Sequence, residues 1–169
     1  MSEKKYRPER TLVFPVRGDE VLLGRKKRHH ARSFGVGKWN GFGGKVEVGE
    51  SLAQAAIREC REEAGITPTK MEKVAVNNFF DDYGMVAHVF LVTEWDGEVV
   101  ETEEMQPQWF KKSELPFDEM WDDDIFWVPP VLAGKKIHGN FHFASSDDSD
   151  GTAKNPLSSV EVRILDEIV

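Results

Sequence analysis

The segment from Ser51 to Gly65 constrains the fold of this 169-residue chain more than any other. Ser51, followed three residues later by Gln54, forms a capping-box pattern that predicts the start of a helix. Gly65 is well placed to end that helix in a left-handed conformation. Side chains suited to a core recur on one helical face, and these are Ala53, Ala56, Ile57, Cys60 and Ala64. The pattern therefore predicts a helix packed against a core.

A second face of the same predicted helix is acidic. Glu59, Glu62 and Glu63 have i, i+3, i+4 spacing, so their carboxylates project to one side. Three like charges on one face repel each other, and divalent cations between them would remove that repulsion. The alternative is a solvated acidic face with Arg58 and Arg61 as ion-pair partners. The spacing of the three glutamates alone does not decide between these interpretations.

Composition and charge narrow the class of protein. A chain of this length, with 40% hydrophobic residues, supports one domain over residues 1–169 without stabilising disulfides. Cys60 is the only cysteine, which indicates a reducing compartment. No apolar run reaches the length of a membrane span, and the first ten residues are charged rather than signal-like. We therefore expect a soluble, cytoplasmic protein that is a monomer and has no membrane partner.

The net charge of −8 argues against long nucleic acid as a partner. Affinity for such polymers comes from neutralising many phosphates with basic side chains. A small phosphorylated ligand remains compatible with an acidic protein, because carboxylates can bind divalent cations that in turn bind phosphates. The expected partner is therefore a small-molecule nucleotide.

The remaining elements are predicted from periodicity and turn residues. Apolar runs that predict strands lie at Thr11–Arg17, Glu20–Lys26, Val74–Phe80, Met85–Glu94 and Gln108–Lys111. Trp39–Gly44 is expected to be a glycine-rich turn. Trp121–Leu132 has helical spacing, which Pro129 and Pro130 should distort or interrupt.

Two predictions concern the end of the chain. Residues 144–156 are rich in Ser, Asp and Gly, which predicts a mobile loop. Ser159–Ile168 fits a closing strand or a helix, and the strand is preferred. Strands mixed with two main helices indicate a layered α/β (α+β) domain.

The helix and the loop before it share one longer pattern of fixed positions. Gly44 is followed after five residues by Glu50, and Glu50 after seven residues by Arg58-Glu59. The acidic pair Glu62-Glu63, then Gly65 and Ile66, completes the pattern. This spacing resembles the signature of the Nudix hydrolase family, with Cys60 in a position usually occupied by an aliphatic residue.

The resemblance implies a mixed β-sheet sandwiched between helices, with a loop–helix–loop catalytic element. Glu59, Glu62 and Glu63 would then bind Mg²⁺, with Mn²⁺ as a substitute, and Arg58 would orient the carboxylates. Gly43 and Gly44 would bring backbone carbonyls close to the metal, where side chains would obstruct. Glu50 is expected to be structural.

Hydrolysis of a phosphoanhydride also requires a group that accepts a proton from the attacking water. Glu63 and Glu104 are the candidates for this general base, and Glu104 is a further candidate metal ligand. Glu104 lies outside the signature, and it is equally well explained as an ordinary loop acid.

Segments outside the signature indicate the substrate class. Lys38–Val46, Glu104–Phe110 and Leu115–Asp124 resemble the branch of the family that hydrolyses oxidised purine nucleoside triphosphates. Members of that branch convert 8-oxo-dGTP, and in some cases 2-oxo-dATP, to the monophosphate and pyrophosphate, which sanitises the nucleotide pool and avoids DNA damage. The alternatives are a Nudix hydrolase of a dinucleoside polyphosphate, a nucleotide sugar or an ordinary dNTP, and a non-catalytic nucleotide-binding module.

A base site is predicted from aromatic and polar residues. Aromatic and methionine side chains can enclose a planar base, and the candidates, which core packing would also explain, are Phe34, Met85, Trp121, Trp127 and Phe143. The polar candidates for substrate binding are Thr11, Asn40, Asp123 and Asp124. Lys27 and Lys45 are the candidate phosphate-binding residues.

The two adjacent aspartates suggest how a base would be recognised. Asp123 and Asp124, crowded in an apolar site, raise each other's pKa, so that one keeps a proton and donates it to a base carbonyl. Capping of a helix N-terminus is the alternative explanation for Asp122–Asp124. Asp122 stands where the branch has proline, the loop 29–37 is longer and places Phe34 in doubt, and the tail after Ala144 does not match.

Overall fold

Strand β1 (Glu9–Arg17) is an interior strand of a mixed sheet in a computed structural model that describes residues 7–27, 35–80, 84–144 and 156–168. The path of hydrogen-bonded strands is β3-β2-β1-β6-β5-β8-β9, with β4 paired to β1 and β7 paired to β2. β1 runs parallel to β6 and antiparallel to β2 and β4. The other strands are β2 (Glu20–Lys26), β3 (Trp39–Asn40), β4 (Phe42–Lys45), β5 (Thr67–Phe80), β6 (Met85–Asp96), β7 (Met105–Lys111), β8 (Lys136–Phe143) and β9 (Leu157–Leu165).

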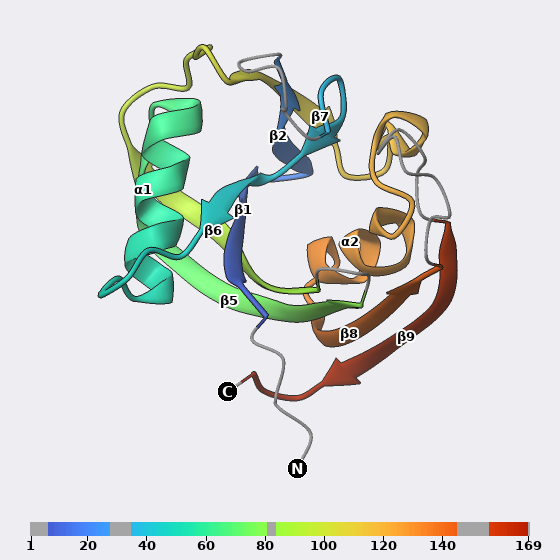
Figure 1. Cartoon of the computed structure of the whole chain (residues 1–169). Helices are drawn as coiled ribbons and strands as arrows, with labels where there is room; N and C mark the ends of the chain where they lie inside the picture. Colours follow the sequence, from blue (N-terminus) through green and yellow to red (C-terminus); the bar gives the residue numbers. More distant parts are fainter. Residues whose placement is uncertain (1–6, 28–34, 81–83, 145–155, 169) are drawn as a thin grey trace.

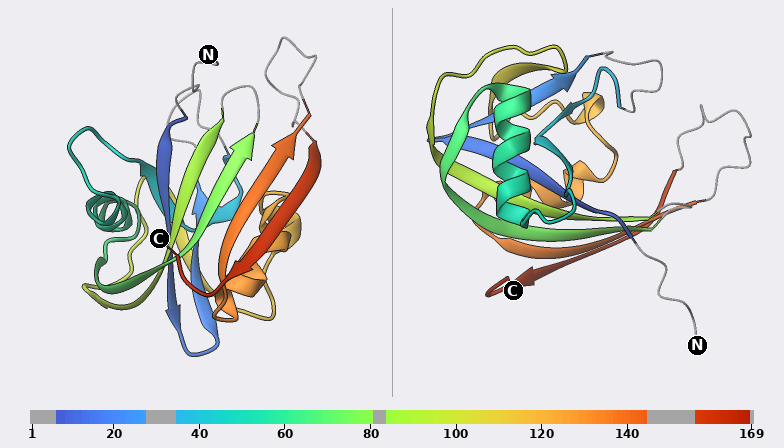
Figure 2. Two further views of the ribbon diagram at one scale, coloured as in Figure 1. Left: turned by 90° about the horizontal axis from the view of Figure 1, so that it is seen from below. Right: turned by 60° about the vertical axis from the view of Figure 1, so that its left-hand side comes forward.

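Two helices cover opposite faces of this sheet (Figures 1 and 2). Val13 packs in the core with Ala56 and Cys60 of α1 (Leu52–Ala64). Its neighbour Phe14 packs in a second core with Trp127 of α2 (Asp124–Leu132). Successive side chains of a strand point to opposite faces, so β1 contributes to both cores. The predicted layered architecture, a sheet between helices, is confirmed.

Several predicted elements differ from the structure. Trp39–Gly44 is not simply a turn, because β3 pairs with β2 and β4 pairs with β1. β5 begins at Thr67, seven residues before the predicted strand start at Val74. β8 was not predicted as a strand, and β9 confirms the strand expected near the end. The mobile loop predicted at 144–156 lies almost entirely outside the described residues.

The two prolines do not interrupt α2, which was one of the two effects predicted for them, the other being a distortion. Pro129 and Pro130 lie inside the nine-residue helix, which ends only two residues later. Their missing N–H groups leave the carbonyls of Ile125 and Phe126 without helical donors. Ile125 and Phe126 are about half exposed, so water can satisfy these carbonyls. No helix in the described ranges is long and apolar enough to cross a membrane.

Candidate active site

Helix α1 is fixed at both ends, which sets the direction of its acidic side chains. The Ser51 hydroxyl accepts a hydrogen bond from the Gln54 amide (3.1 Å), and the Gln54 side chain accepts one from the Ser51 amide (2.9 Å). This is the predicted capping box. Gly65 adopts a left-handed conformation (φ 77°), and its amide donates to the Arg61 carbonyl. The predicted helix boundaries are therefore confirmed.

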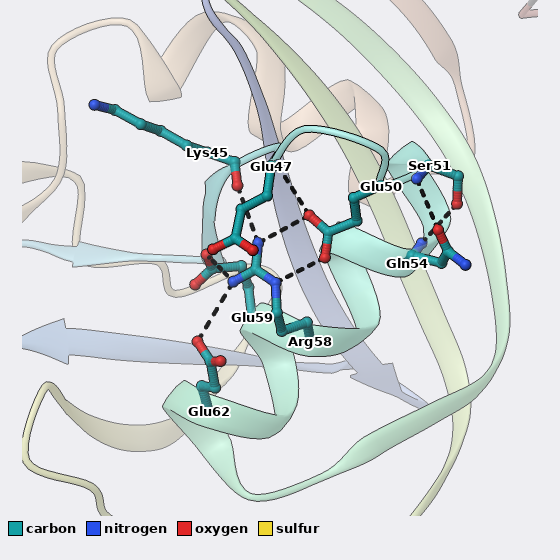
Figure 3. A network of polar contacts seen from close by, with 8 residues as sticks. All are labelled: Lys45, Glu47, Glu50, Ser51, Gln54, Arg58, Glu59 and Glu62. Atoms are coloured by element: carbon teal, nitrogen blue, oxygen red, sulfur yellow. Dashed lines mark hydrogen bonds and ion pairs between the residues drawn. The ribbon is translucent and has the colours of Figure 1, made fainter.

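Arg58 connects the loop before α1 to the acidic face of the helix (Figure 3). Its guanidinium donates to both carboxylate oxygens of Glu50, at 2.7 and 3.0 Å, and to the Lys45 carbonyl at 3.0 Å. The remaining nitrogen donates to Glu59 at 2.7 Å and lies 3.5 Å from Glu62. The Arg58 hydrogen bond is the main cause that lowers the pKa of Glu50. Arg58 thus holds Glu59 in place while Glu50 anchors the loop.

Glycine residues on β4 allow the helix to approach the sheet closely. A side chain at Gly44 would begin only 2.3 Å from a carboxylate oxygen of Glu59. At Gly43 it would collide with the Thr11 carbonyl on β1. The Glu59 carboxylate therefore lies directly over glycine backbone, and a larger residue at Gly44 would displace it.

Glu63 is the most buried of the four predicted metal-binding glutamates, with 3% of its surface exposed. Burial raises its pKa to about 9, with further increases from the charges of Glu59 and Glu104 and a lowering by a hydrogen bond from the Gly43 backbone. Its Oε2 atom has no hydrogen-bond partner in the described part of the protein. An ionised carboxylate in this position is stable only if positive charge is brought next to it.

The carboxylates of the α1 site have the chemistry that a hard divalent cation requires, but they do not form a preorganised metal site. Within the described ranges, no three His, Cys, Asp or Glu side chains are close enough together to hold a metal ion. Glu62 extends toward Arg58 with its side chain 57% exposed, and Glu104 is also exposed. Glu63 supplies an unpartnered buried oxygen beside Glu59, and hard cations such as Mg²⁺ prefer carboxylate oxygens. The donor set therefore fits the predicted cofactor.

A second pair of buried acids lies at the start of α2, on the other side of the sheet. Asp123 and Asp124 are 5% and 2% exposed. Burial raises the pKa of both, and that of Asp124 rises well above its usual range because the Asp123 charge adds to the effect. The indole of Trp127 donates to Asp123 at 2.9 Å and favours its ionised form. Of the two, Asp124 is therefore the acid whose protonated form is favoured more strongly.

Helix capping does not explain these aspartates. Asp123 is the N-cap residue by position, yet its side chain makes no capping hydrogen bond. Asp124 accepts instead from the amide of Trp121, which precedes the helix (3.1 Å). The Asp123 carboxyl is thus held by the Trp127 indole and the Asp124 carboxyl by the Trp121 amide.

Lys38 is a site residue that the sequence analysis missed. Its ammonium lies 5.1 Å from the centre of the Trp121 ring and donates to the Met120 carbonyl. Its charge also lowers the pKa of Asp124. The only available signal was its position directly before Trp39-Asn40, within a segment already singled out. Asn40, on β3, accepts from the Gly41 amide at 2.8 Å.

The aromatic candidates do not all have the same environment. Trp127 is 1% exposed and packs edge-on against Phe14, so it is a core residue, and its indole donates to Asp123. Trp121 is half-buried, as are Met85 at the start of β6 and Phe143 at the end of β8. Met85 and Phe143 pack at the margin of the core beneath α2.

The other candidates are more dispersed. Thr11 is buried, and strand alternation places it on the α1 side of the sheet, opposite to Asp123 and Asp124. Lys27 is engaged by Glu101 at 2.6 Å and by the Thr102 carbonyl at 2.8 Å. The exposed Lys45 side chain points away from the Arg58 network (Figure 3). Phe34 lies outside the described residues.

Comparisons with known proteins decide the family. The NUDIX domain model matches residues 6–129. The chain belongs to the Nudix family. It is similar to the oxidized purine nucleoside triphosphate hydrolases of Danio rerio (46% identity) and Mus musculus (42%), in both cases over 81% of this chain and 87% of the relative. The MutT protein from Bacillus halodurans has a similar structure, with a TM-score of 0.71, 27% identity, and 92% and 97% of the two chains covered. The resemblance stated from the Gly44–Ile66 signature is thereby confirmed, as is the Nudix fold.

Proposed function

We propose that this Nudix domain hydrolyses oxidised purine nucleoside triphosphates, such as 8-oxo-dGTP, to the monophosphate and pyrophosphate. The observation that carries the proposal is the pairing of two different acidic sites. Glu59 and Glu63 lie on α1, and the buried Asp123–Asp124 pair lies at the start of α2. The similar oxidized purine nucleoside triphosphate hydrolases of Danio rerio and Mus musculus, 87% of whose length this chain covers, support this substrate class. We place the activity in the cytoplasm, where it would remove damaged nucleotides from the precursor pool.

Glu59, Glu62, Glu63 and Glu104 would hold Mg²⁺, with Mn²⁺ as a substitute. The bound cation would neutralise phosphoryl oxygens and favour ionisation of the attacking water. Arg58 keeps the Glu59 carboxylate facing Gly44 and prevents it from turning toward solvent. We assign acceptance of the water's proton to Glu104, because Glu63 is buried and Glu104 is reachable from solvent.

The base would be recognised by the pair of aspartates and the amide of Asn40. Oxidised guanine presents N–H donors and carbonyl acceptors along its edges. Ionised Asp123 accepts from an N–H group, and protonated Asp124 donates to a carbonyl. Trp121 and Met85 supply flat or adaptable apolar surface for the ring. A transfer of the proton from Asp124 to Asp123 would reverse this pattern and allow oxidised adenine to bind.

A substrate panel tests the proposal. Pyrophosphate release from 8-oxo-dGTP, 2-oxo-dATP, dGTP and a dinucleoside polyphosphate is measured with Mg²⁺ at equal concentrations. We expect kcat/KM to be highest for an oxidised purine nucleotide. Equal turnover of dGTP and every oxidised nucleotide would contradict the sanitising function, and preference for the dinucleoside polyphosphate would indicate a different Nudix activity.

A further inference from the structure

Asn77, in the middle of β5, is a buried amide that nothing described so far uses. It is 1% exposed, and neither its Oδ1 nor its Nδ2 atom has a hydrogen-bond partner among the residues described. Leaving a buried donor and acceptor without partners destabilises a fold, so such groups are usually paired with protein, water or ligand. A leucine would fill the same position at lower cost. We therefore expect the Asn77 amide to have a hydrogen-bond partner that the described part of the chain does not supply.

The face of the sheet on which Asn77 lies follows from its neighbours. Ala75 and Phe79, two residues away on either side, belong to the core that contains Trp127 of α2. Alternation along β5 places Asn77 on this same face. It thus shares a side of the sheet with Asp123 and Asp124, and it lies opposite to the Glu59–Glu63 cluster.

The residues beside Asn77 on both neighbouring strands are small. It pairs in register with Ala87 on β6 and with Gly139 on β8. A side chain at Gly139 would begin 2.6 Å from the Asn77 oxygen and 2.5 Å from the Phe141 ring. Glycine at position 139 therefore makes room for the amide. On the β6 side, the neighbour Ala87 has only a small side chain.

Asn77 also lies next to residues that are not fully covered by α2. Two residues further along β5, on the same face, Phe79 pairs with Met85 of β6. Met85 is half-buried. Leu12 on the central strand β1, which packs against the same core, is also only half-buried. The amide is consequently one row inward from Met85, which is a candidate base-binding residue.

We infer that Asn77 is a specificity-determining residue, whose amide binds the polar edge of the nucleobase at the inner end of the base site. The inference rests on the proposed function and extends it. An asparagine amide donates and accepts at once, which matches an N–H group beside a carbonyl on an oxidised purine. The α2 carboxyls and the β5 amide would then contact the base from two sides, with Gly139 leaving room for the amide itself.

The test compares two leucine variants of adjacent asparagines. Asn77→Leu removes both polar atoms at similar size. Asn78→Leu is the matched control, because Asn78 points to the opposite face and its amide contacts His138 and Asn140 instead. We measure KM and kcat for 8-oxo-dGTP and dGTP, together with the melting temperature. Asn77→Leu should lower the ratio of kcat/KM for the two nucleotides by about tenfold or more, mainly through KM, as loss of a hydrogen bond to the base would do.

Two results would overturn the inference. One is an unchanged ratio in a folded Asn77→Leu protein, which would leave the amide a purely structural element. The other is an equal loss of ratio in Asn78→Leu, which would indicate a general distortion of β5. If Asn77→Leu does not fold, Asn77→Ala is used, and binding of 8-oxo-dGMP is measured by calorimetry at low temperature, where unchanged affinity again overturns the inference.

The experiment separates this inference from the proposed function. Wild-type protein is measured first, and absence of any preference for an oxidised purine would refute the proposed function alone. Asn77 is then judged on whichever base the wild type prefers. A preference that Asn77→Leu does not alter would refute the role of Asn77 and leave the proposed function standing.

Discussion

Buried acids lie on opposite sides of one sheet, Glu63 on one side and Asp123 with Asp124 on the other, and the two sites differ in what surrounds these acids. Glu63, on the sheet-facing side of α1, lies close to Glu59 and Glu104, and burial raises its pKa to about 9. Asp124 at the start of α2 lies beside Asp123, and burial raises its pKa as well. Burial therefore favours a bound proton at both sites when each is considered alone.

Their neighbours give the two sites different chemistry. Arg58 pairs with Glu59 and Glu50 at the outer rim of the first site, whereas the buried Oε2 of Glu63 has no partner within the described residues. In the second site a neutral indole donates to Asp123, and a backbone amide donates to Asp124. The first arrangement suits a cation that replaces a proton, and the second suits a proton that is kept. The predictions below test this difference.

Glu63→Gln should have the largest effect. The change removes a proposed cation ligand while preserving size and the neutral state that burial favours. We expect kcat to fall by about a thousandfold, as for loss of a principal stabilising group in a transition state. The melting temperature without metal should remain unchanged or rise, because no carboxylate is left to ionise in the buried site. Steady-state kinetics and thermal unfolding measure the two quantities.

The control for Glu63→Gln is Glu62→Gln, on the same helix but with a largely exposed side chain. A smaller loss there would show that burial of the carboxylate matters. Near-normal turnover by Glu63→Gln would contradict the proposed cation site and would leave Glu63 a structural acid of α1.

Asp124→Ala should affect base choice rather than phosphate chemistry. We expect kcat/KM for 8-oxo-dGTP to fall by about ten- to a hundredfold, because a site built to hydrogen-bond a substrate group loses that pairing. Hydrolysis of a poor substrate such as dGTP should change much less. Parallel kinetics with the two nucleotides measure the difference. An equal loss for both nucleotides would contradict the proposed separation of base recognition at Asp124 from phosphate chemistry at the α1 glutamates.

Arg58→Lys should have an intermediate effect that is confined to the first site. Lysine retains the charge but cannot donate to Glu50 and Glu59 in the forked geometry of arginine. We expect roughly a tenfold loss in kcat, with the ratio between oxidised and ordinary nucleotides unchanged. A shift in that ratio would show that the two sites are coupled across the sheet.

The first site could largely be predicted from the sequence because its residues are close together in the chain. The helix, its caps and its acidic face all depend on i, i+3, i+4 spacing between Ser51 and Gly65. Burial of Glu63 could not be predicted in this way, since it depends on the approach of β4, whose Gly43 backbone hydrogen-bonds to Glu63. The sequence pattern treats Glu62 and Glu63 alike, whereas the folded chain exposes one and buries the other.

The second site illustrates the limits of local patterns. Asp123 and Asp124 were found through resemblance, while Lys38 and Asn77 reach the same side of the sheet from distant segments. The placement of Asn77 on that face depends on strand pairings such as β5 with β8, which no local signal specifies. The prolines of α2 misled the prediction for a related reason, because solvent exposure of Ile125 and Phe126 is a property of the folded chain.

Asp124→Asn should have the smallest effect, a change in the pH dependence of stability. The folded-state pKa of Asp124 lies above its ordinary value of 3.8, so the folded protein binds a proton that the unfolded chain has released. Stability from this group is fully present below about pH 3.8 and is lost as pH rises toward the folded-state pKa. Asparagine cannot ionise, and it still accepts from the Trp121 amide. The variant should therefore gain stability over wild type as pH increases from 5 to 8, by roughly 2–4 °C in melting temperature for each kcal/mol. Thermal unfolding with EDTA at constant salt measures this gain, and melting curves that stay parallel across the pH range would show that Asp124 is already ionised in the fold.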